Sequence, residues 1–217
     1  MDWLGGIDIR LLNSAKAVSH RPFTSPALLT RDKAILSYLL EDLRGLTATT
    51  ETSAVIQPYE PIEWLVHGRK RRAVICNPES LQSARRELCL VGFFGERHLD
   101  RDGTPLEETN AELVLEFKHY PGILSYSSME LVDGNWANLV LHDKPEAREY
   151  WRASQRHAEA ATRLSPLFYR TVRIHNGVIP RGVAGKGSIV IQRTKYWDFA
   201  RSTVWQAVRE YEDAAGT

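Results

Sequence analysis

The second half of the chain alternates between two hydrophobic periods, one typical of strands and one typical of helices. Runs rich in β-branched and aromatic residues predict strands at 88–94, 123–131, 136–141 and 169–174. Amphipathic helices are expected between the first two runs and between the last two. A further strand is expected at 188–196, so the order from residue 88 is β-α-β-β-α-β with an extra C-terminal strand.

This order is the split-βαβ, or ferredoxin-like, pattern, which predicts an α+β fold over residues 86–217. Both crossover helices then lie on one face of an antiparallel sheet, and the other face is left bare. The strand at 123–131 carries apolar residues on both sides, with Ile123, Met129 and Leu131 expected to share one of them. The bare face therefore needs a cover, either a second subunit or the N-terminal third.

Residues 1–85 are expected to form an α/β extension or a second ferredoxin-like half. A helix over 31–43, with leucines at i, i+3 and i+4 spacing, is predicted to follow Thr30 as its N-cap. Short strands are expected at 7–12, 53–57, 64–67 and 73–76.

Cap and turn signals set the expected ends of the C-terminal elements. Thr104 and Glu107 have the spacing of a capping box, and Asp143 is expected to cap the second crossover helix. Turns or helix ends are expected at Asp133-Gly134, Ser165-Pro166 and Asn176-Gly177.

The second crossover helix carries the most informative side chains of the chain. Tyr150, Trp151, Ser154 and His157 fall on its apolar face, which looks onto the sheet in this pattern. His157 has three interpretations: a ligand of heme iron, a general acid or base, or a buried histidine that is only hydrogen-bonded. The aromatic rings belong to the core by default, and as walls of a pocket they would stack on a flat ligand.

Two strands and their neighbours add polar candidates. Asn138 shares a strand face with Trp136, and its amide either orients a substrate oxygen or bonds a neighbouring backbone group. Arg173 and His175 alternate along the fourth strand, on a face that is either solvated or turned to the ligand. In the second case Arg173 would bind a carboxylate or phenolate, together with Tyr126.

The spacing Trp151-x-x-Ser154-x-x-His157-x-x-x-Ala161, within this element order, resembles the dimeric α+β barrel superfamily, especially its antibiotic-biosynthesis-monooxygenase-like branch. The resemblance covers about residues 86–199. It implies a homodimer that holds a small hydrophobic or aromatic substrate between sheet and helices. It also implies a small-molecule oxidative enzyme, heme-dependent or without a cofactor. The alternatives are a cofactor-free cyclase, isomerase or lyase, and a ligand-binding protein without catalysis.

The resemblance assigns roles to the candidate residues. His157, Asn138 and Arg173 are expected to be catalytic, and His157 would ligate the metal if heme is the cofactor. The substrate is expected to contact Tyr126, Trp136, Tyr150, Trp151, Ser154 and His175.

Charge and composition exclude several other classes. The chain has 28 Lys and Arg against 27 Asp and Glu, a net charge of +1, so nucleic acid and anionic membranes are not expected partners. The two cysteines and the lack of a signal-peptide pattern favour a cytoplasmic protein. The basic run 67–72 is interpreted as a solvated hairpin tip, with an anionic group of heme or substrate as the alternative partner. Residues 182–188 fail the phosphate-loop pattern and are interpreted as a flexible connection.

Overall fold

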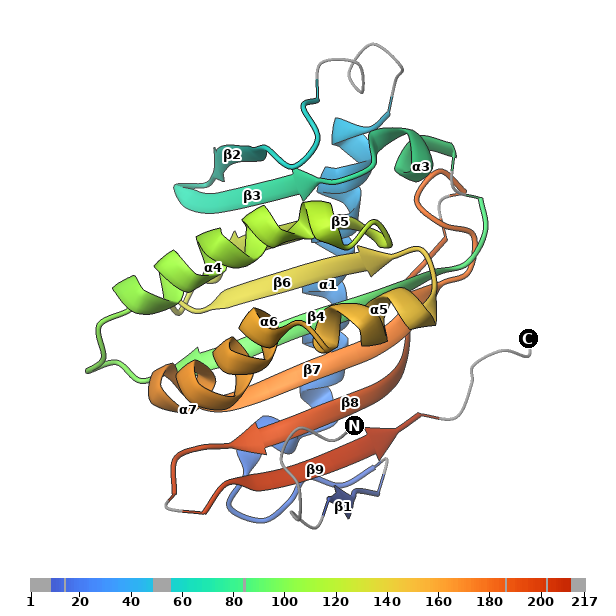
Figure 1. The fold of residues 1–217 in the computed structure, drawn as a ribbon. Coiled ribbons are helices and arrows are strands. Elements are labelled where there is room, and N and C mark those ends of the chain that lie inside the picture. Colours follow the sequence, from blue (N-terminus) through green and yellow to red (C-terminus); the bar gives the residue numbers. More distant parts are fainter. Residues whose placement is uncertain are drawn as a thin grey trace.

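A nine-stranded sheet runs through the molecule, in the order β1-β9-β8-β7-β4-β6-β5-β3-β2 (Figure 1). The computed structural model describes residues 9–13, 15–48, 56–83, 85–185, 187–201 and 203–211. Helices lie on both faces of the sheet, so the fold is mixed α+β, as predicted. The strand expected at 53–57 lies mostly outside the described residues.

The elements have the following bounds. The strands are β1 (Arg10–Leu11), β2 (Pro61–Val66), β3 (Arg69–Ile75), β4 (Leu88–Arg97), β5 (Ile123–Glu130), β6 (Trp136–His142), β7 (Tyr169–Ile179), β8 (Val190–Asp198) and β9 (Trp205–Glu210). The α-helices are α1 (Ala27–Leu46), α3 (Pro78–Ser83), α4 (Thr104–Glu116), α5 (Pro145–Arg152), α6 (Gln155–Glu159) and α7 (Ser165–Phe168). Shorter turns are η1 (Pro22–Thr24), η2 (Phe117–His119) and the π-helical η3 (Ala160–Leu164).

The predicted order of elements is present from β4 to β7. The four expected strands are β4, β5, β6 and β7, and α4 and the α5–α7 segment connect them on one face of the sheet (Figure 1). These strands lie in the order β7-β4-β6-β5, and each neighbouring pair is antiparallel. β8 pairs with β7 as the extra C-terminal strand.

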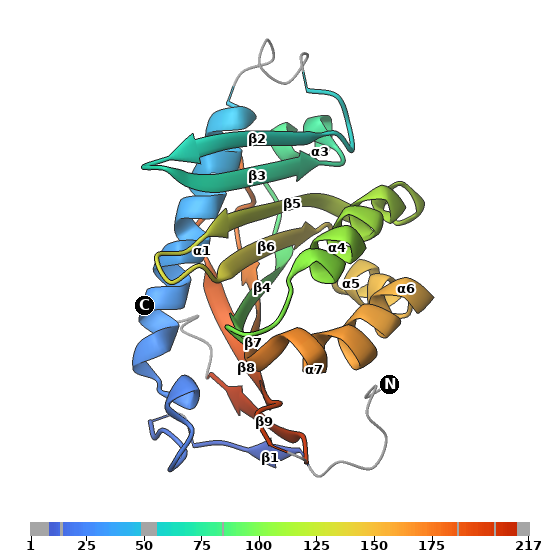
Figure 2. The same ribbon diagram turned by 90° about the vertical axis from the view of Figure 1, so that its left-hand side faces the viewer.

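The opposite face of the sheet is covered by α1, from the N-terminal third (Figure 2). The helix buries Leu36, Leu39, Leu40 and Leu43 in one cluster with apolar side chains of the sheet. Gly92 on β4 permits this close approach, because a Cβ there would lie 2.6 Å from Leu36 Cδ1. The apolar face that lacked a cover in the sequence pattern is covered from within the same chain.

Segments outside the expected ferredoxin-like order extend the same sheet at both edges. The β2–β3 hairpin pairs with β5, while β9 pairs with β8 and, in parallel, with β1. The hairpin turns at His67 and Gly68, whose φ angles of 50° and 76° suit the tight turn that matches strand twist. The basic run 67–72 therefore begins at a hairpin tip, as predicted.

The second crossover helix is broken, whereas the sequence predicts one continuous helix. α5 ends at Arg152, and Ser154 caps the new helix α6 by accepting a hydrogen bond from the His157 backbone N–H at 3.2 Å. Ser165-Pro166 begins α7 instead of ending the helix, since proline is tolerated in a first helical turn. The prediction of one continuous helix is therefore wrong, because α5, α6, η3 and α7 together fill this segment.

The predicted helix caps are not formed. Thr104 lies inside α4, and its backbone N–H and hydroxyl both donate to Asp102 Oδ1, so it forms no capping box with Glu107. Neither Thr30 nor Asp143 is the N-cap of its helix. Proline in the first turn marks the start of both α4 and α5 instead.

Two bulges shift strand faces relative to the sequence pattern. Asn176-Gly177, predicted to be a turn, lies at a register shift inside β7, where a Cβ on Gly177 would lie 2.1 Å from a β8 carbonyl oxygen. A register shift between Ile123 and Ser125 of β5 places Ile123 in the cluster under α4, whereas Met129 packs on the α1 side. The predicted common side of these two residues is wrong because a bulge interrupts the two-residue alternation.

Candidate functional site

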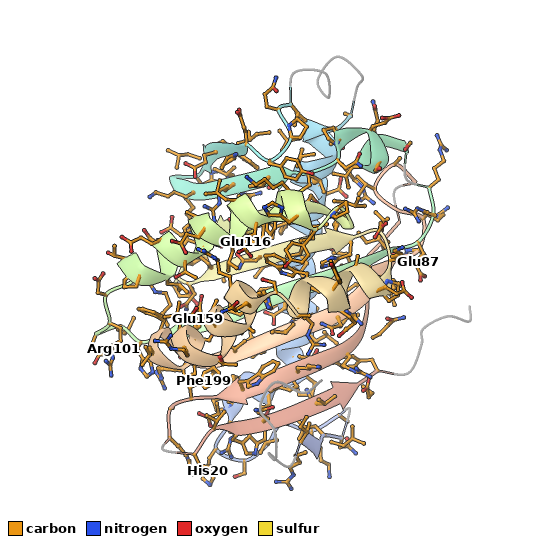
Figure 3. All side chains as sticks on the ribbon, viewed as in Figure 1. His20, Glu87, Arg101, Glu116, Glu159 and Phe199 are labelled. Carbon is orange, nitrogen blue, oxygen red and sulfur yellow. The ribbon has the colours of Figure 1, made fainter. Side chains whose placement is uncertain are left out.

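A cleft of about 430 Å³ lies between α4 and the α6–η3 segment. Figure 3 labels one residue from each of its sides, Glu116 on α4 and Glu159 on α6. Both sides contribute polar side chains, which can bond the polar parts of a ligand. The lining consists of Thr109, Glu112, Glu116, Gln155, Arg156, Glu159, Ala160 and Leu164.

The sheet beneath these helices is incompletely covered. On β6, Ala137 and Leu139 are buried in the cluster with α1, whereas Asn138 and Val140, which face the other way, are partly exposed. Phe93 on β4, which pairs with Asn138, is also partly exposed. Side chains at the centre of a wide sheet reach solvent only where the covering helices leave an opening. We call the partly exposed side chains on this face the floor; they include Phe93, Trp136, Asn138 and Ile174, none of which is among the residues that line the cleft.

Ion pairs between the helices hold the rim of the cleft. Arg156 on α6 pairs with Glu112 and, at 3.1 Å, with Glu116 on α4. Ser154 Oγ donates to the second carboxylate oxygen of Glu116 at 3.2 Å. Glu159 also lines the cleft and forms an ion pair with Arg163, so the three carboxylates of the rim are matched by two arginines.

His157 is not part of the cleft lining but packs against Trp151, with 5.2 Å between the ring centroids. Burial, together with the charge of Arg152, lowers the pKa of His157 to about 4. His142, at the end of β6, is buried too, and burial with the nearby Arg148 charge lowers its pKa to about 3. Both imidazoles are neutral at pH 7, and such a low pKa makes His157 a weak base.

Trp151 belongs to an aromatic cluster between α4 and α5. Its ring centroid lies 5.3 Å from Phe117 and 4.8 Å from Tyr120, and the residue is 7% exposed. Tyr150 is 68% exposed, so the prediction that it looks onto the sheet is wrong. Consecutive helical residues point about 100° apart, so Trp151 can be buried while its neighbour Tyr150 points to solvent.

Arg173 and His175 lie on the other face of the sheet, beneath α1. Arg173 donates to both oxygens of Asp32, at 2.7 Å from Nε and 3.0 Å from Nη2. His175 Nε2 lies 2.9 Å from Asp32 Oδ2, and its Nδ1 lies 2.8 Å from Thr194 Oγ1. Burial raises the pKa of Asp32, but the hydrogen bonds from His175 and Arg173 outweigh it, so the pKa is lowered overall. This network joins α1 to the sheet and is separated from the cleft by the sheet itself.

The structure brings some of the candidate residues together and separates others. Asn138, Trp136 and Tyr126 share the cleft side of the sheet, with the Tyr126 hydroxyl 3.3 Å from Asn110 Oδ1 on α4. Trp151 and Ser154 lie at the junction of α5 and α6, whereas Arg173 and His175 lie beneath α1. The catalytic and binding roles of all these residues stay predictions.

Two residues on the cleft side were not identified from the sequence. Ser128 pairs with Asn138, and Arg72 pairs with Ser128, so the three form one row across β6, β5 and β3. Ser128 lies two residues from Tyr126 on β5, so the alternation of strand faces in the sequence already placed the two on the same side of the sheet. Arg72 belongs to the basic run, but the face on which it lies depends on the register of the hairpin.

The described residues also limit the chemistry of the site. No group of three or more His, Cys, Asp or Glu side chains among them is placed to hold a metal ion. Burial raises the pKa of the Cys76 thiol to about 12, so this cysteine carries no thiolate at neutral pH. No helix in the described part of the chain has the length and apolar character to span a membrane.

Comparison with known proteins gives only distant likenesses. No family model and no curated protein matches the chain. Among solved structures, protein SO0527 from Shewanella oneidensis is similar to this chain. The likeness covers 43% of this chain and 93% of that protein, with 13% sequence identity and a TM-score of 0.36. A variant of SnoaB, a cofactor-independent oxygenase from Streptomyces nogalater, is similar as well. That likeness covers 42% of this chain and 89% of the SnoaB chain, with 18% sequence identity and a TM-score of 0.34. More than half of the chain lies outside each likeness.

Proposed function

We propose that this protein is a small-molecule enzyme of the cofactor-free oxygenase type, with its substrate in the cleft between α4 and α6–η3. The observation that carries the proposal is the partly exposed floor of β4 and β6, because on the other face of the same strands every residue except Glu96 is buried. An opening over apolar side chains with a few polar groups is typical of sites for small organic molecules. Within this proposal, β4–β7 and their helices form a ferredoxin-like unit.

Asn138 is the polar group of the floor. Its amide both donates and accepts hydrogen bonds, and no other described residue bonds it. Phe93 pairs with Asn138 across β4 and β6, and Trp136 lies two residues away on the same face. A flat, largely apolar molecule can stack on these rings and place one oxygen at the amide.

The floor suits oxygenation better than acid–base chemistry, because none of its side chains titrates near neutral pH. In a cofactor-free monooxygenation the substrate is the reductant. In the keto tautomer of a fused-ring phenol, the ring carbon opposite the carbonyl group bears two hydrogens. This carbon takes up one atom of O2 as a carbonyl oxygen, and its two hydrogens leave with the other atom as water. The protein then has to hold an electron-rich substrate away from bulk water, which apolar walls accomplish.

Heme fits the described residues of this cleft poorly. Its two propionates are anionic, whereas three carboxylates line the cleft and the arginines beside them, Arg156 and Arg163, are held in ion pairs with these carboxylates. His157, the expected iron ligand, does not line the cleft. We therefore propose no step through heme. Titration with hemin, followed by absorption spectroscopy, is expected to show no saturable shift of the Soret band, and a stoichiometric shift that His157→Ala abolishes would overturn this view.

Oxygen uptake tests the proposed reaction. The purified protein is incubated under air and under nitrogen with phenols of two to four fused rings, while dissolved oxygen and product mass are followed. Turnover is expected under air only, with a product that has gained one oxygen and lost two hydrogens. Conversion that continues under nitrogen would contradict oxygenation and favour a cyclase, isomerase or lyase.

The role of Asn138 is tested by Asn138→Leu, which removes the amide at similar volume. The variant is expected to lose at least about tenfold in turnover, because an oriented hydrogen bond to the reacting group is lost. Asn176→Leu, the same change on the same sheet face, is the matched control. Equal turnover in Asn138→Leu and wild type would remove Asn138 from the reaction.

A ligand-binding protein without catalysis is the second candidate. The observation that favours it is the lack of an acid, base or nucleophile among the described residues of the floor. This candidate predicts that ligands raise the melting temperature in proportion to their occupancy while no product forms.

A further inference from the structure

A row of polar side chains crosses the sheet from the cleft floor to the N-terminal hairpin. It contains Asn138 on β6, Ser128 on β5 and Arg72 on β3, each directly paired with the next. Neighbouring strands lie about 4.8 Å apart, so the Cα atoms at the two ends of the row are about 10 Å apart. α4 lies over the middle of this row, where Tyr126 contacts Asn110 of that helix (Figure 1).

Two atoms of this row are buried and have no hydrogen-bond partner among the described residues, Ser128 Oγ and Arg72 Nε. Ser128 is 1% exposed, and Arg72 lies with its guanidinium carbon 5.5 Å from the centre of the Tyr126 ring. Buried polar groups are nearly always hydrogen-bonded, because an unbonded one has lost its water without compensation. Ser125 Oγ and Ser127 Oγ on the other face of β5 also lack a partner, so it is the pairing of an unbonded hydroxyl with an unbonded guanidinium N–H that points to an acceptor supplied by a ligand.

Arg72 and its neighbour Arg71 differ in their partners. Arg71, on the opposite face of β3, forms an ion pair with Asp42 of α1. Within the described part of the chain, Arg72 makes no ion pair, and its cross-strand neighbour Glu63 is exposed. Arg72 as a whole is partly exposed, although its Nε is buried.

We propose that Arg72, Ser128 and Asn138 bind an oxyanion, a carboxylate or phenolate, of the small molecule held in the cleft. This inference rests on the proposed function, because the remainder of the ligand would occupy the cleft. Guanidinium, hydroxyl and amide all supply hydrogen-bond donors, and a charged acceptor strengthens each bond. The N-terminal hairpin thereby contributes Arg72, which is the cationic group of the row. The proposed substrates are therefore flat molecules that carry an acidic group.

A matched pair of ligands tests this anchor. 2-Naphthoate and its neutral counterpart 2-naphthamide have the same ring system, and their affinities are measured at pH 7 by calorimetry. Wild-type protein is expected to bind the acid at least about tenfold more tightly, since bonds to charged groups exceed neutral ones by that margin. Arg72→Gln is expected to abolish this preference and leave the affinity for the amide unchanged. Lys70→Gln, which removes the same charge two residues away on the same strand face, should keep the preference.

Ser128→Ala provides a test that does not depend on the fold of the arginine variant. It should weaken naphthoate binding several-fold without lowering the melting temperature, because the lost hydroxyl makes no bond within the described structure. A loss of stability without a change in binding would show a structural role and overturn the anchor.

The two proposals fail in different ways. If wild type binds acid and amide equally, or if Arg72→Gln keeps the preference, the anchor is wrong and the cleft proposal stands. If neither naphthalene derivative binds, the cleft proposal itself is contradicted, and the anchor falls with it.

Discussion

At the scale of single residues, the buried histidines have the clearest effect on this protein. His142 and His157 stay neutral in the folded chain, because burial lowers the pKa of His142 to about 3 and of His157 to about 4. The sequence offered three interpretations of His157; the structure places it against Trp151 and outside the cleft lining, and its role stays a prediction. Both residues couple the stability of the helix layer to pH.

We predict that the protein loses stability as the pH falls from about 6.5 to 4. In this window the unfolded chain binds protons at both histidines and the folded chain does not, so protonation favours unfolding by about 1.4 kcal/mol per pH unit for each. Urea unfolding should therefore give a free energy about 4 kcal/mol lower at pH 5 than at pH 7.

Replacement of one histidine separates its contribution from the rest. His142→Gln should reduce the difference between pH 7 and pH 5 by about half, whereas His119→Gln, at an exposed position, should leave it unchanged. An unchanged difference in His142→Gln would show that other groups cause the acid sensitivity.

At the scale of elements, the break between α5 and α6 distinguishes the structure from the helix that the sequence predicts. The Ser154 hydroxyl accepts a hydrogen bond from the His157 backbone N–H and donates one to Glu116. One side chain therefore caps α6 and links this helix to α4. The hydrophobic period continues through this break, because Trp151 before it and His157 after it both face inward.

The sign of one stability change tests this break. Ser154→Ala should lower the free energy of unfolding by about 1 kcal/mol, because an N-cap bond is lost. In a continuous helix the same change would raise it, since alanine is the better helix former. Ser83→Ala in α3 is the control and should change little, because its hydroxyl only bonds a carbonyl of the preceding turn.

The attachment of α1 depends on the buried ion network of Asp32. Asp32→Asn should lower the free energy of unfolding by about 3–5 kcal/mol, because it leaves the half-buried Arg173 without its counter-charge. Glu41→Gln, an exposed partner of Arg44 on the same helix, should cost less than about 1 kcal/mol. A loss below that value in Asp32→Asn would show that leucine packing alone holds the helix.

At the scale of the whole molecule, α1 occupies the face through which a dimeric barrel was expected to pair. Its four buried leucines each contribute about 1.5–3 kcal/mol by leaving water, so displacing the helix for a partner sheet is costly. The same arrangement leaves the cleft side open, and it adds the β2–β3 hairpin with Arg72 to that side.

Sedimentation equilibrium at micromolar concentration tests this consequence. We expect a species of 24.7 kDa, one chain. A stable dimer would require a different surface, such as the exposed edge strand β2 with Leu65. Mutation of Leu65 to Lys would then dissociate it, whereas a dimer that resists this change would point again to the α1 face.

Local periodicity was sufficient for the strands β4 to β7, for the presence of helical segments between them and for the two-sided character of the sheet. Alternation fails where a bulge inserts a residue, as at Ile123 and at Asn176-Gly177, because the partner strand decides where the extra residue goes. Helix caps were misplaced because Ser, Thr and Asp favour caps and turns alike, and packing selects among them.

The sequence by itself determined the α+β class, the order of the central elements and the apolar face that required a cover, since hydrophobic burial depends on local period. Only the tertiary structure decided that α1 supplies this cover, that Arg173 and His175 bond Asp32 beneath it, and that Arg72 joins Asn138 on the other side. These outcomes depend on contacts between segments far apart in the chain, and no local pattern encodes the register that brings them together.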